Sequence, residues 1–213
     1  MEFEAFQKIP RLSRDCVITE KLDGTNASVY IGEDGSFLTG SRTRWITPDD
    51  DNYGFARWAN ERRDELLLLG PGHHFGEWWG QGVQRGYGLT EKRFSLFNTH
   101  RWSDPAVRPA CCHVVPVLFS GPFTSMAADS IIALLATEGS LAAPGFMEPE
   151  GIIVFHAAAS ALFKKTIKGD EEGKHAEAHP PKPKVPRQPK DPSKGGRRIA
   201  QLPYDGADRR KAA

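Results

Sequence analysis

A stretch rich in proline and lysine near the C-terminus limits where this chain can build a core. From about His179 to Lys194, prolines alternate with basic residues. Proline removes a backbone donor and like charges repel, so such a segment cannot supply a packed interior. Residues 171–213 hold 11 Lys and Arg against 6 Asp and Glu, whereas residues 1–170 hold 17 against 21. We therefore predict one folded domain over residues 1–170 and a basic, disordered tail over residues 171–213.

The tail itself has two interpretations. A lysine-rich segment can attract a phosphate backbone without sequence preference. It can equally act as a solubilising extension with no partner. The sequence favours neither.

The body reads as α+β, with antiparallel sheets and covering helices. A turn at residues 32–35 signals a hairpin. Asp51 or Asn52 can begin a helix whose apolar residues recur every three or four positions from Phe55 to Leu69. A second helix is predicted from Thr124 to a stop at Gly139. Strands are expected near residues 16–19, 27–31, 36–39, 73–79, 93–98, 112–119, 151–156 and 162–167.

Several patterns bear on location and metal content. The apolar runs, such as residues 114–119, are far shorter than a membrane span. The N-terminus has no basic segment followed by an apolar one, so we expect no signal peptide. Three cysteines, two of them adjacent, give no disulfide framework and no zinc spacing. We predict a cytoplasmic monomer without membrane contact, in which His73-His74 and Cys111-Cys112-His113 are structural.

The run TEKLDGTN at residues 19–26 is the strongest candidate for chemistry. A Lys-x-Asp-Gly match arises by chance in roughly 4% of chains this long, and Asp-Gly is also an ordinary turn. The functional interpretation is nucleotidyl transfer, in which a neutral lysine amine attacks an α-phosphate. Such a site should place further basic groups near Lys21, to hold phosphates and to favour the neutral amine.

The chain supplies candidate partners for Lys21 in a consistent order. Arg42 follows the hairpin and can contact phosphate or ribose. Glu77 lies in a glycine-bounded strand and can accept hydrogen bonds from ribose hydroxyls. The aromatic rings of residues 94–97 can stack on a purine. Glu150 begins a strand and can hold Mg²⁺ through water. Three lysines at residues 164–168 can stabilise charge on a transferring phosphate. Each of these residues, taken alone, has an ordinary structural explanation. Their occurrence together in this order favours the functional interpretation.

These motifs together resemble those of the ATP-dependent RNA ligases, within the superfamily of covalent nucleotidyltransferases. The run at 19–26 resembles the nucleotidyl-lysine motif, and its closing Gly-Thr-Asn favours the RNA ligase branch. Residues 75–77, 150–153 and 163–164 resemble the third, fourth and fifth motifs, and residues 115–123 resemble the strand before the last helix. The resemblance covers residues 5–170 and implies a nucleotidyltransferase domain, the ATP-grasp-like adenylation domain of ligases.

The resemblance also implies a role for each residue. Lys21 would form lysyl-AMP, and Thr19 and Glu20 would lie beside the adenine, Glu20 through its backbone. Asn26 and Arg42 would contact ribose or phosphate, and Glu77 the ribose hydroxyls. Phe97 would stack on adenine, Glu150 would organise Mg²⁺, and Lys164 would contact the α-phosphate. ATP and Mg²⁺ are the expected cofactors, and RNA ends or a nicked RNA duplex the expected substrate.

Two departures from the family pattern stand out. The fifth motif usually reads Lys-x-Lys, and here Thr166 takes the place of the second lysine. Strand alternation suggests Lys168 as a substitute, and a local bulge would bring Lys165 to the site instead. Many relatives also carry a folded C-terminal domain, where this chain has the predicted tail.

Two alternatives to an RNA ligase remain at this stage. A DNA ligase or a capping-type guanylyltransferase would use the same lysine chemistry. An RNA-binding module with impaired catalysis would explain the incomplete fifth motif.

Overall fold

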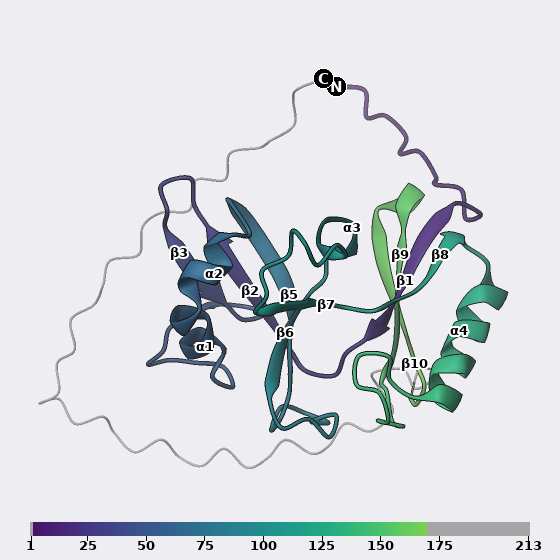
Figure 1. Cartoon of the computed structure of the whole chain (residues 1–213). Coiled ribbons are helices and arrows are strands. Elements are labelled where there is room, and N and C mark those ends of the chain that lie inside the picture. The colour runs from purple at the N-terminus through teal and green to yellow at the C-terminus, as the bar shows by residue number, and fades with distance from the viewer. Residues whose placement is uncertain (1, 170–213) are drawn as a thin grey trace, which may run out of the picture. The chain divides into compact units, whose positions relative to one another are not determined.

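The computed structural model describes residues 2–169, so the tail predicted at 171–213 lies outside the described residues. Two sheets organise this part of the chain (Figure 1). The predicted α+β class, with antiparallel sheets and covering helices, is confirmed, and one parallel pair is the exception. Within the described residues, no helix is long and apolar enough to cross a membrane.

The small sheet has four strands in the order β10-β9-β1-β8. All its pairs are antiparallel. A 14-residue helix, α4, packs on one face (Figure 1). Thr124 accepts a hydrogen bond from the N–H of Ala127, and the helix ends before Gly139, as predicted from the sequence. The bounds are β1 Asp15–Lys21, β8 Val117–Pro122, α4 Ser125–Glu138, β9 Gly151–His156 and β10 Ala161–Thr166.

The large sheet has six strands in the order β4-β3-β2-β5-β6-β7, with β6 and β7 parallel. The short helices α1 and α2 cover one face, and α3 follows β6 (Figure 1). The bounds are β2 Thr25–Ile31, β3 Phe37–Gly40, β4 Trp45–Ile46, α1 Phe55–Glu61, α2 Arg63–Leu67, β5 Gly72–Gly80, β6 Lys92–Leu96, α3 Thr99–Trp102 and β7 Cys112–Val114. A 3₁₀ turn spans Ala157–Ala159 between β9 and β10.

Two of the predicted elements have a different form in the structure. The single helix expected from Phe55 to Leu69 is two helices, because the backbone leaves helical geometry at Arg62, where φ is −112°. The strand expected at 112–119 is also two, in different sheets. Pro116 lies in the gap, and proline cannot donate to a strand ladder. Its carbonyl accepts from the N–H of Glu20, which keeps β8 beside β1.

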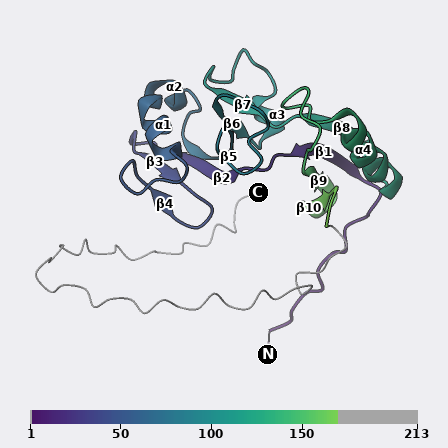
Figure 2. The same ribbon diagram turned by 90° about the horizontal axis from the view of Figure 1, so that it is seen from below.

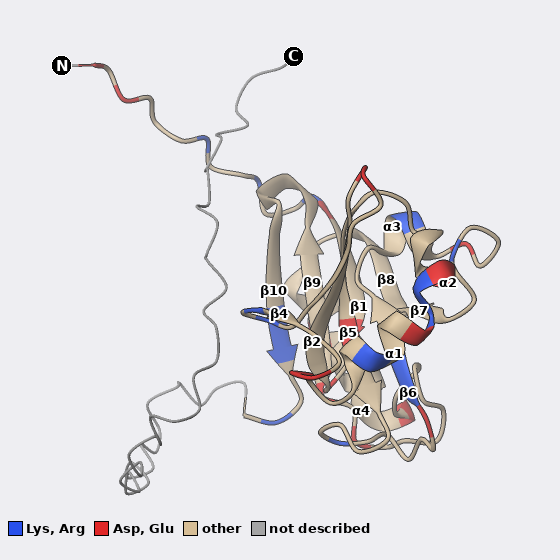
Figure 3. Cartoon of the chain, turned by 90° about the vertical axis from the view of Figure 1, so that its left-hand side faces the viewer, with Lys and Arg blue, Asp and Glu red and all other residues tan. Residues whose placement is uncertain are grey.

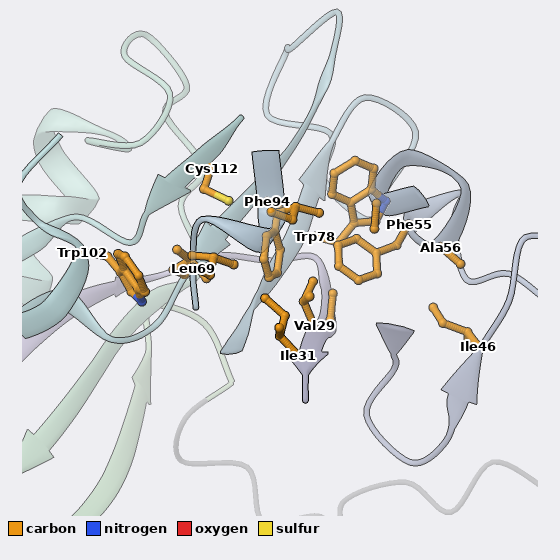
Figure 4. Close-up of a cluster of buried hydrophobic side chains, with 14 of the residues drawn as sticks. Val29, Ile31, Ile46, Phe55, Ala56, Leu69, Trp78, Phe94, Trp102 and Cys112 are labelled. Atoms are coloured by element: carbon orange, nitrogen blue, oxygen red, sulfur yellow. The ribbon is translucent and has the colours of Figure 1, made fainter. Parts of the chain in front are cut away.

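Strand alternation separates core from cleft in the large sheet. Val29 and Ile31 of β2 point into a core with Trp78 and Phe94 (Figure 4). Ala27 of the same strand belongs to this core as well. The intervening residues of β2 face the other way. The chain then connects the two sheets directly, because only residues 22–24 separate β1 from β2 (Figure 2). The end of β1 is therefore the point where the two sheets meet.

Candidate active site

Lys21 is the last residue of β1, at the junction of the two sheets. It pairs with Gly151 across the small sheet, and its Nζ lies 2.5 Å from the Oε2 of Glu150. Both side chains are mostly shielded from solvent. Gly24 ends the connection to β2, where a Cβ would lie 2.4 Å from the carbonyl oxygen of Trp78. The run at 19–26 therefore has a glycine because the backbone passes directly over β5.

The loop after Lys21 is held by residues that the sequence did not single out. The hydroxyl of Tyr87 accepts a hydrogen bond from the N–H of Asp23, at 2.8 Å. Arg85 donates to the carboxylate of Asp23 at 2.7 Å and to the carbonyl of Glu148 at 2.9 Å. Arg85 thus connects the Lys21 loop to the segment that carries Glu150. Nothing local in the sequence signals these contacts, which join residues more than 60 positions apart.

Glu77 faces this loop from β5. Its carboxylate accepts from the N–H of Gly24 at 3.1 Å and from the amide of Asn26 at 3.4 Å. Burial raises the pKa of Glu77 to about 7, and the charge of Lys21 only partly offsets that rise. A carboxylate with long hydrogen bonds in a buried site can still take further donors, such as ribose hydroxyls.

A cleft of about 1150 Å³ gathers most of the predicted site. Its walls come from β1, β9 and β10 on one side and from β2, β5 and the β6–α3 segment on the other. The predicted site residues that line it are Thr19, Glu20, Lys21, Asn26, Arg42, Glu77, Phe97 and Lys164. Glu150 joins them through its ion pair with Lys21. Lys168 is not among the lining residues.

The two adjacent lysines of the fifth motif lie on β10, where the ribbon is blue in Figure 3, and strand alternation directs them to opposite faces. Lys164 lines the cleft, and Thr166 shares its side of the strand by alternation. Lys165 points to the opposite face, where its Nζ lies 2.6 Å from the Oδ1 of Asp129 on α4. The proposed bulge that would turn Lys165 to the site is therefore wrong. Lys168 follows the strand, is 78% exposed and lies 3.6 Å from Glu148. The structure leaves Lys164 as the lysine of this motif that reaches the cleft.

Glu20 has a structural contact that the sequence did not predict. Its side chain is only 1% exposed and points away from Lys21, by strand alternation. The carboxylate accepts from the hydroxyl of Ser140 at 2.5 Å and from the N–H groups of Leu141 and Ala142 at 2.9 Å. Burial raises the pKa of Glu20, and these three donors oppose that rise. Glu20 thus fixes the loop after α4 behind the cleft.

The surroundings of Lys21 differ from the sequence prediction, which expected other basic side chains close to it. Its direct contact is a carboxylate, Glu150, while Arg42 and Lys164 lie elsewhere along the cleft. Within residues 2–169, no group of three or more His, Cys, Asp or Glu side chains could hold a metal by itself. Mg²⁺ commonly binds one or two carboxylates, substrate phosphates and water. Glu150 at the cleft fits that mode.

The structure also shows the surroundings of the adjacent residues His73-His74 and Cys111-Cys112. His74 is buried, with its Nε2 2.9 Å from the carbonyl of Gly70. Cys112 is buried in the core, and its Sγ lies 3.9 Å from that of Cys111. His74 and Cys112 thus make contacts within the fold, and the structural role expected of the two clusters stays a prediction. His73, in contrast, lines the cleft.

Comparison with known proteins adds a family. A family model described as RNA ligase matches residues 14–171. A ligand-free mutant of an RNA ligase from Naegleria gruberi has a similar structure, with a TM-score of 0.53 and 20% identity over 72% of this chain and 50% of that chain. For a mutant of a Naegleria gruberi RNA ligase with ATP and Mn, the TM-score is 0.52 and the identity is 22%, over 72% of this chain and 49% of that chain. For another mutant of a Naegleria gruberi RNA ligase, with AMP and Mn, the TM-score is 0.53 and the identity is 20%, over 73% of this chain and 50% of that chain.

At these identities, the similarity establishes the fold. The chain spans about half the length of the solved ligases that it matches. A search of curated protein sequences found no match.

Proposed function

This chain belongs to the RNA ligase family, and from that premise we propose that it is an ATP-dependent RNA ligase that works through a lysyl-AMP intermediate. It would join a 5′-phosphate to a 3′-hydroxyl, at free RNA ends or at a nick in a duplex. The observation that supports this most is the position of the Lys21 amine. It lies at the junction of the sheets, in a cleft shared with Glu77, Arg42 and Lys164.

The first step forms the intermediate. The Nζ of Lys21 attacks the α-phosphorus of ATP, a P–N bond forms, and the bond to the departing pyrophosphate breaks. From its ammonium form, the nitrogen gives up two of its three protons, one before the attack and one as the P–N bond forms, and it keeps the third. Glu150, the group in contact with Nζ, is placed to accept one of them. Lys164 and Arg42 offset the negative charge on the phosphates from the two sides of the cleft.

The next two steps pass AMP on and remove it. An oxygen of the RNA 5′-phosphate attacks the same phosphorus, and the P–N bond to Lys21 breaks. The 3′-hydroxyl of the other end then attacks the RNA phosphorus, a phosphodiester forms, and AMP leaves. Asn26 and Arg42 line the same cleft as Lys21 and are proposed to position the incoming 5′-phosphate.

We propose that the nucleoside of ATP binds in the same cleft. Glu77 is proposed to accept from the ribose hydroxyls, and the exposed ring of Phe97 to stack on adenine. Thr19 lines the same wall as Lys21, and the backbone of Glu20 is proposed to contact the base, because its side chain is engaged with Ser140. Lys168 would reach the phosphates only if the chain after β10 moved.

A divalent metal fits the site through Glu150, and we propose Mg²⁺. When bound, it would offset charge on the phosphate oxygens. Related ligases of this family were solved with Mn. We further propose that the protein is cytoplasmic and acts as a monomer.

The test is covalent labelling with α-labelled ATP and Mg²⁺, read after denaturation. Wild type should retain label and Lys21→Ala should not, while Lys8→Ala, an exposed lysine outside the cleft, should behave as wild type. Unlabelled wild type would contradict the proposal and leave an RNA-binding module. Labelling by GTP in preference to ATP would indicate a capping-type enzyme. Sealing of nicked DNA but not nicked RNA would indicate a DNA ligase, since the 2′-hydroxyl separates the two.

A further inference from the structure

The large sheet carries exposed aromatic rings on the face opposite its core. Trp45 of β4 is 51% exposed and Phe75 of β5 is 54% exposed, although both are large apolar side chains. Tyr30 of β2 and His73 of β5 lie between them. We call these four residues the aromatic platform. Exposed aromatic groups that adjoin one another commonly mark a binding surface.

The strand register explains why the four rings share one face. Tyr30 pairs directly with His73, and the neighbouring Ser28 pairs with Phe75 on β5 and with Gly40 on β3. Gly40 in turn pairs with Trp45. Directly paired residues point to the same side of an antiparallel sheet, so all four rings project from the face opposite Val29.

The ring geometry is continuous across three strands. Ring centroids are 4.0 Å apart for His73 and Phe75 and 5.5 Å apart for Trp45 and His73, with interplanar angles of 35° and 30°. A Cβ on Gly40 would lie 3.3 Å from the indole of Trp45 and 2.6 Å from the Oγ of Ser28. The missing side chain at Gly40 therefore leaves room for the indole to lean across β3 toward His73.

The platform continues the cleft that holds Lys21. His73 and Phe75 line that cleft together with Glu77, which is two residues further along β5. Arg42 also lines it and belongs to the loop between Gly40 and Trp45. The second arginine of that loop, Arg44, forms a two-point ion pair with Asp50, at 2.6 and 3.0 Å. A cation that faces the cleft and an exposed indole thus lie three residues apart, in the loop after β3 and at the start of β4.

From this arrangement we propose that the aromatic platform binds the bases of the single-stranded RNA next to the 5′-phosphate being activated. The inference rests on the proposed function for the identity of the strand. A phosphate held by Arg42 would leave the attached nucleotides beside Trp45 and Phe75, and aromatic rings stack on any base without sequence preference. Desolvation lowers the pKa of His73, which favours the uncharged ring in the middle of the platform.

Binding of a 5′-phosphorylated oligouridine of about ten nucleotides, the length scale of a single-strand site, tests the proposal without ATP. The full chain should bind it, and Trp45→Ala and Phe75→Ala should each weaken the Kd about tenfold or more. Trp45→Phe keeps a ring and should retain most of the affinity. Leu38→Ala is the matched control, because Leu38 pairs with Tyr30 on the same face, is 43% exposed and has no ring. It should change the Kd by less than about twofold.

Fluorescence provides a second readout. Trp45 is the most exposed of the five tryptophans. Stacking on a base should quench its emission on RNA addition, and Trp45→Phe should lose the quench while it still binds. A wild-type chain that does not bind the oligonucleotide would overturn the proposal, and so would unchanged affinity in both alanine variants. Loss of a wild-type dimer in Trp45→Ala with RNA affinity unchanged would assign the surface to a contact between copies and also overturn it.

The two proposals fail separately in these measurements. Binding and quenching need neither ATP nor lysyl-AMP. Wild type that takes label from ATP but binds RNA equally well without the rings would keep the ligase and remove the platform. Wild type that binds RNA through the rings but takes no label would keep the platform and remove the ligase.

Discussion

The two walls of the cleft are built from the same kind of strand but carry different chemistry. The small-sheet wall presents Lys21 and Lys164, with Glu150 in contact with Lys21. The large-sheet wall presents Glu77, a carboxyl with a pKa raised by burial, and the exposed ring of Phe97. The small-sheet wall carries the two lysines proposed to contact phosphate, whereas the large-sheet wall carries most of the proposed nucleoside contacts together with Arg42. Changes in the first should therefore slow AMP transfer, and changes in the second should weaken binding.

The largest effect is expected on β10, where two adjacent lysines point to opposite faces. Lys164 faces the cleft and Lys165 faces α4. Lys164→Ala should slow labelling from ATP by about 10²- to 10³-fold, the usual loss for one group that stabilises transferring charge. Lys165→Ala removes the contact with Asp129 on α4 and should change the rate by less than about threefold, because an exposed ion pair contributes little. Comparable losses in the two variants would contradict the division between faces.

The back of the small-sheet wall depends on Glu20. Glu20→Ala should lower the free energy of unfolding by about 3 kcal/mol, because it leaves the donors of Ser140, Leu141 and Ala142 without their acceptor. Urea denaturation measures this. Glu20→Gln keeps an acceptor and should lose less. A change below about 0.5 kcal/mol in the alanine variant would show that the loop after α4 does not need this anchor.

Glu77 of the large-sheet wall should make the free energy of unfolding depend on pH. The pKa of Glu77 is raised from 4.5 to about 7 in the folded chain. Below pH 4.5 the group is protonated in both states and has no effect. Between 4.5 and 7 only the unfolded state ionises, so stability falls by about 3 kcal/mol, and above 7 the loss is constant. The free energy of unfolding of Glu77→Gln relative to wild type should therefore rise with pH across that window. A flat difference would mean that Glu77 ionises normally.

The smallest effect is expected where the two walls are connected. Arg85→Ala removes the contacts to Asp23 and Glu148, and it should destabilise the chain by about 1 kcal/mol, because the ion pair is partly exposed. Thermal unfolding measures this, and Arg93→Ala, whose ion pair with Glu91 lies outside the cleft, is the control. Destabilisation no greater than that of the control would show that Arg85 does not connect the walls.

The sequence predicted the local parts of the fold and missed those set by distant contacts. The cap at Thr124 and the stop at Gly139 follow from neighbouring residues, and both are present. The two-residue strand β4 could not be predicted, because Trp45 and Ile46 pair with β3 only once the loop between them has folded. The division of the strand at 112–119 was visible at Pro116, but the sequence does not show that its halves belong to different sheets.

The candidate site shows the same division. The run around Lys21 is contiguous and was found directly, and its partners followed from the family order. The contacts of Arg85, Tyr87 and Ser140 depend on tertiary packing and have no local signal. The fifth motif stayed ambiguous, because the side that a lysine faces depends on strand register, which pairs Lys164 with Ile153 and Lys165 with Ile152.

The central claim is that the amine of Lys21 forms a covalent bond with AMP. The most direct test is the intact mass of the chain after incubation with ATP and Mg²⁺, followed by peptide mapping. We expect a mass increase of one adenylyl group, located on Lys21, that is reversed by added pyrophosphate and absent in Lys21→Ala. An unchanged mass in wild type, or an adduct located on Lys164 or another residue, would contradict it.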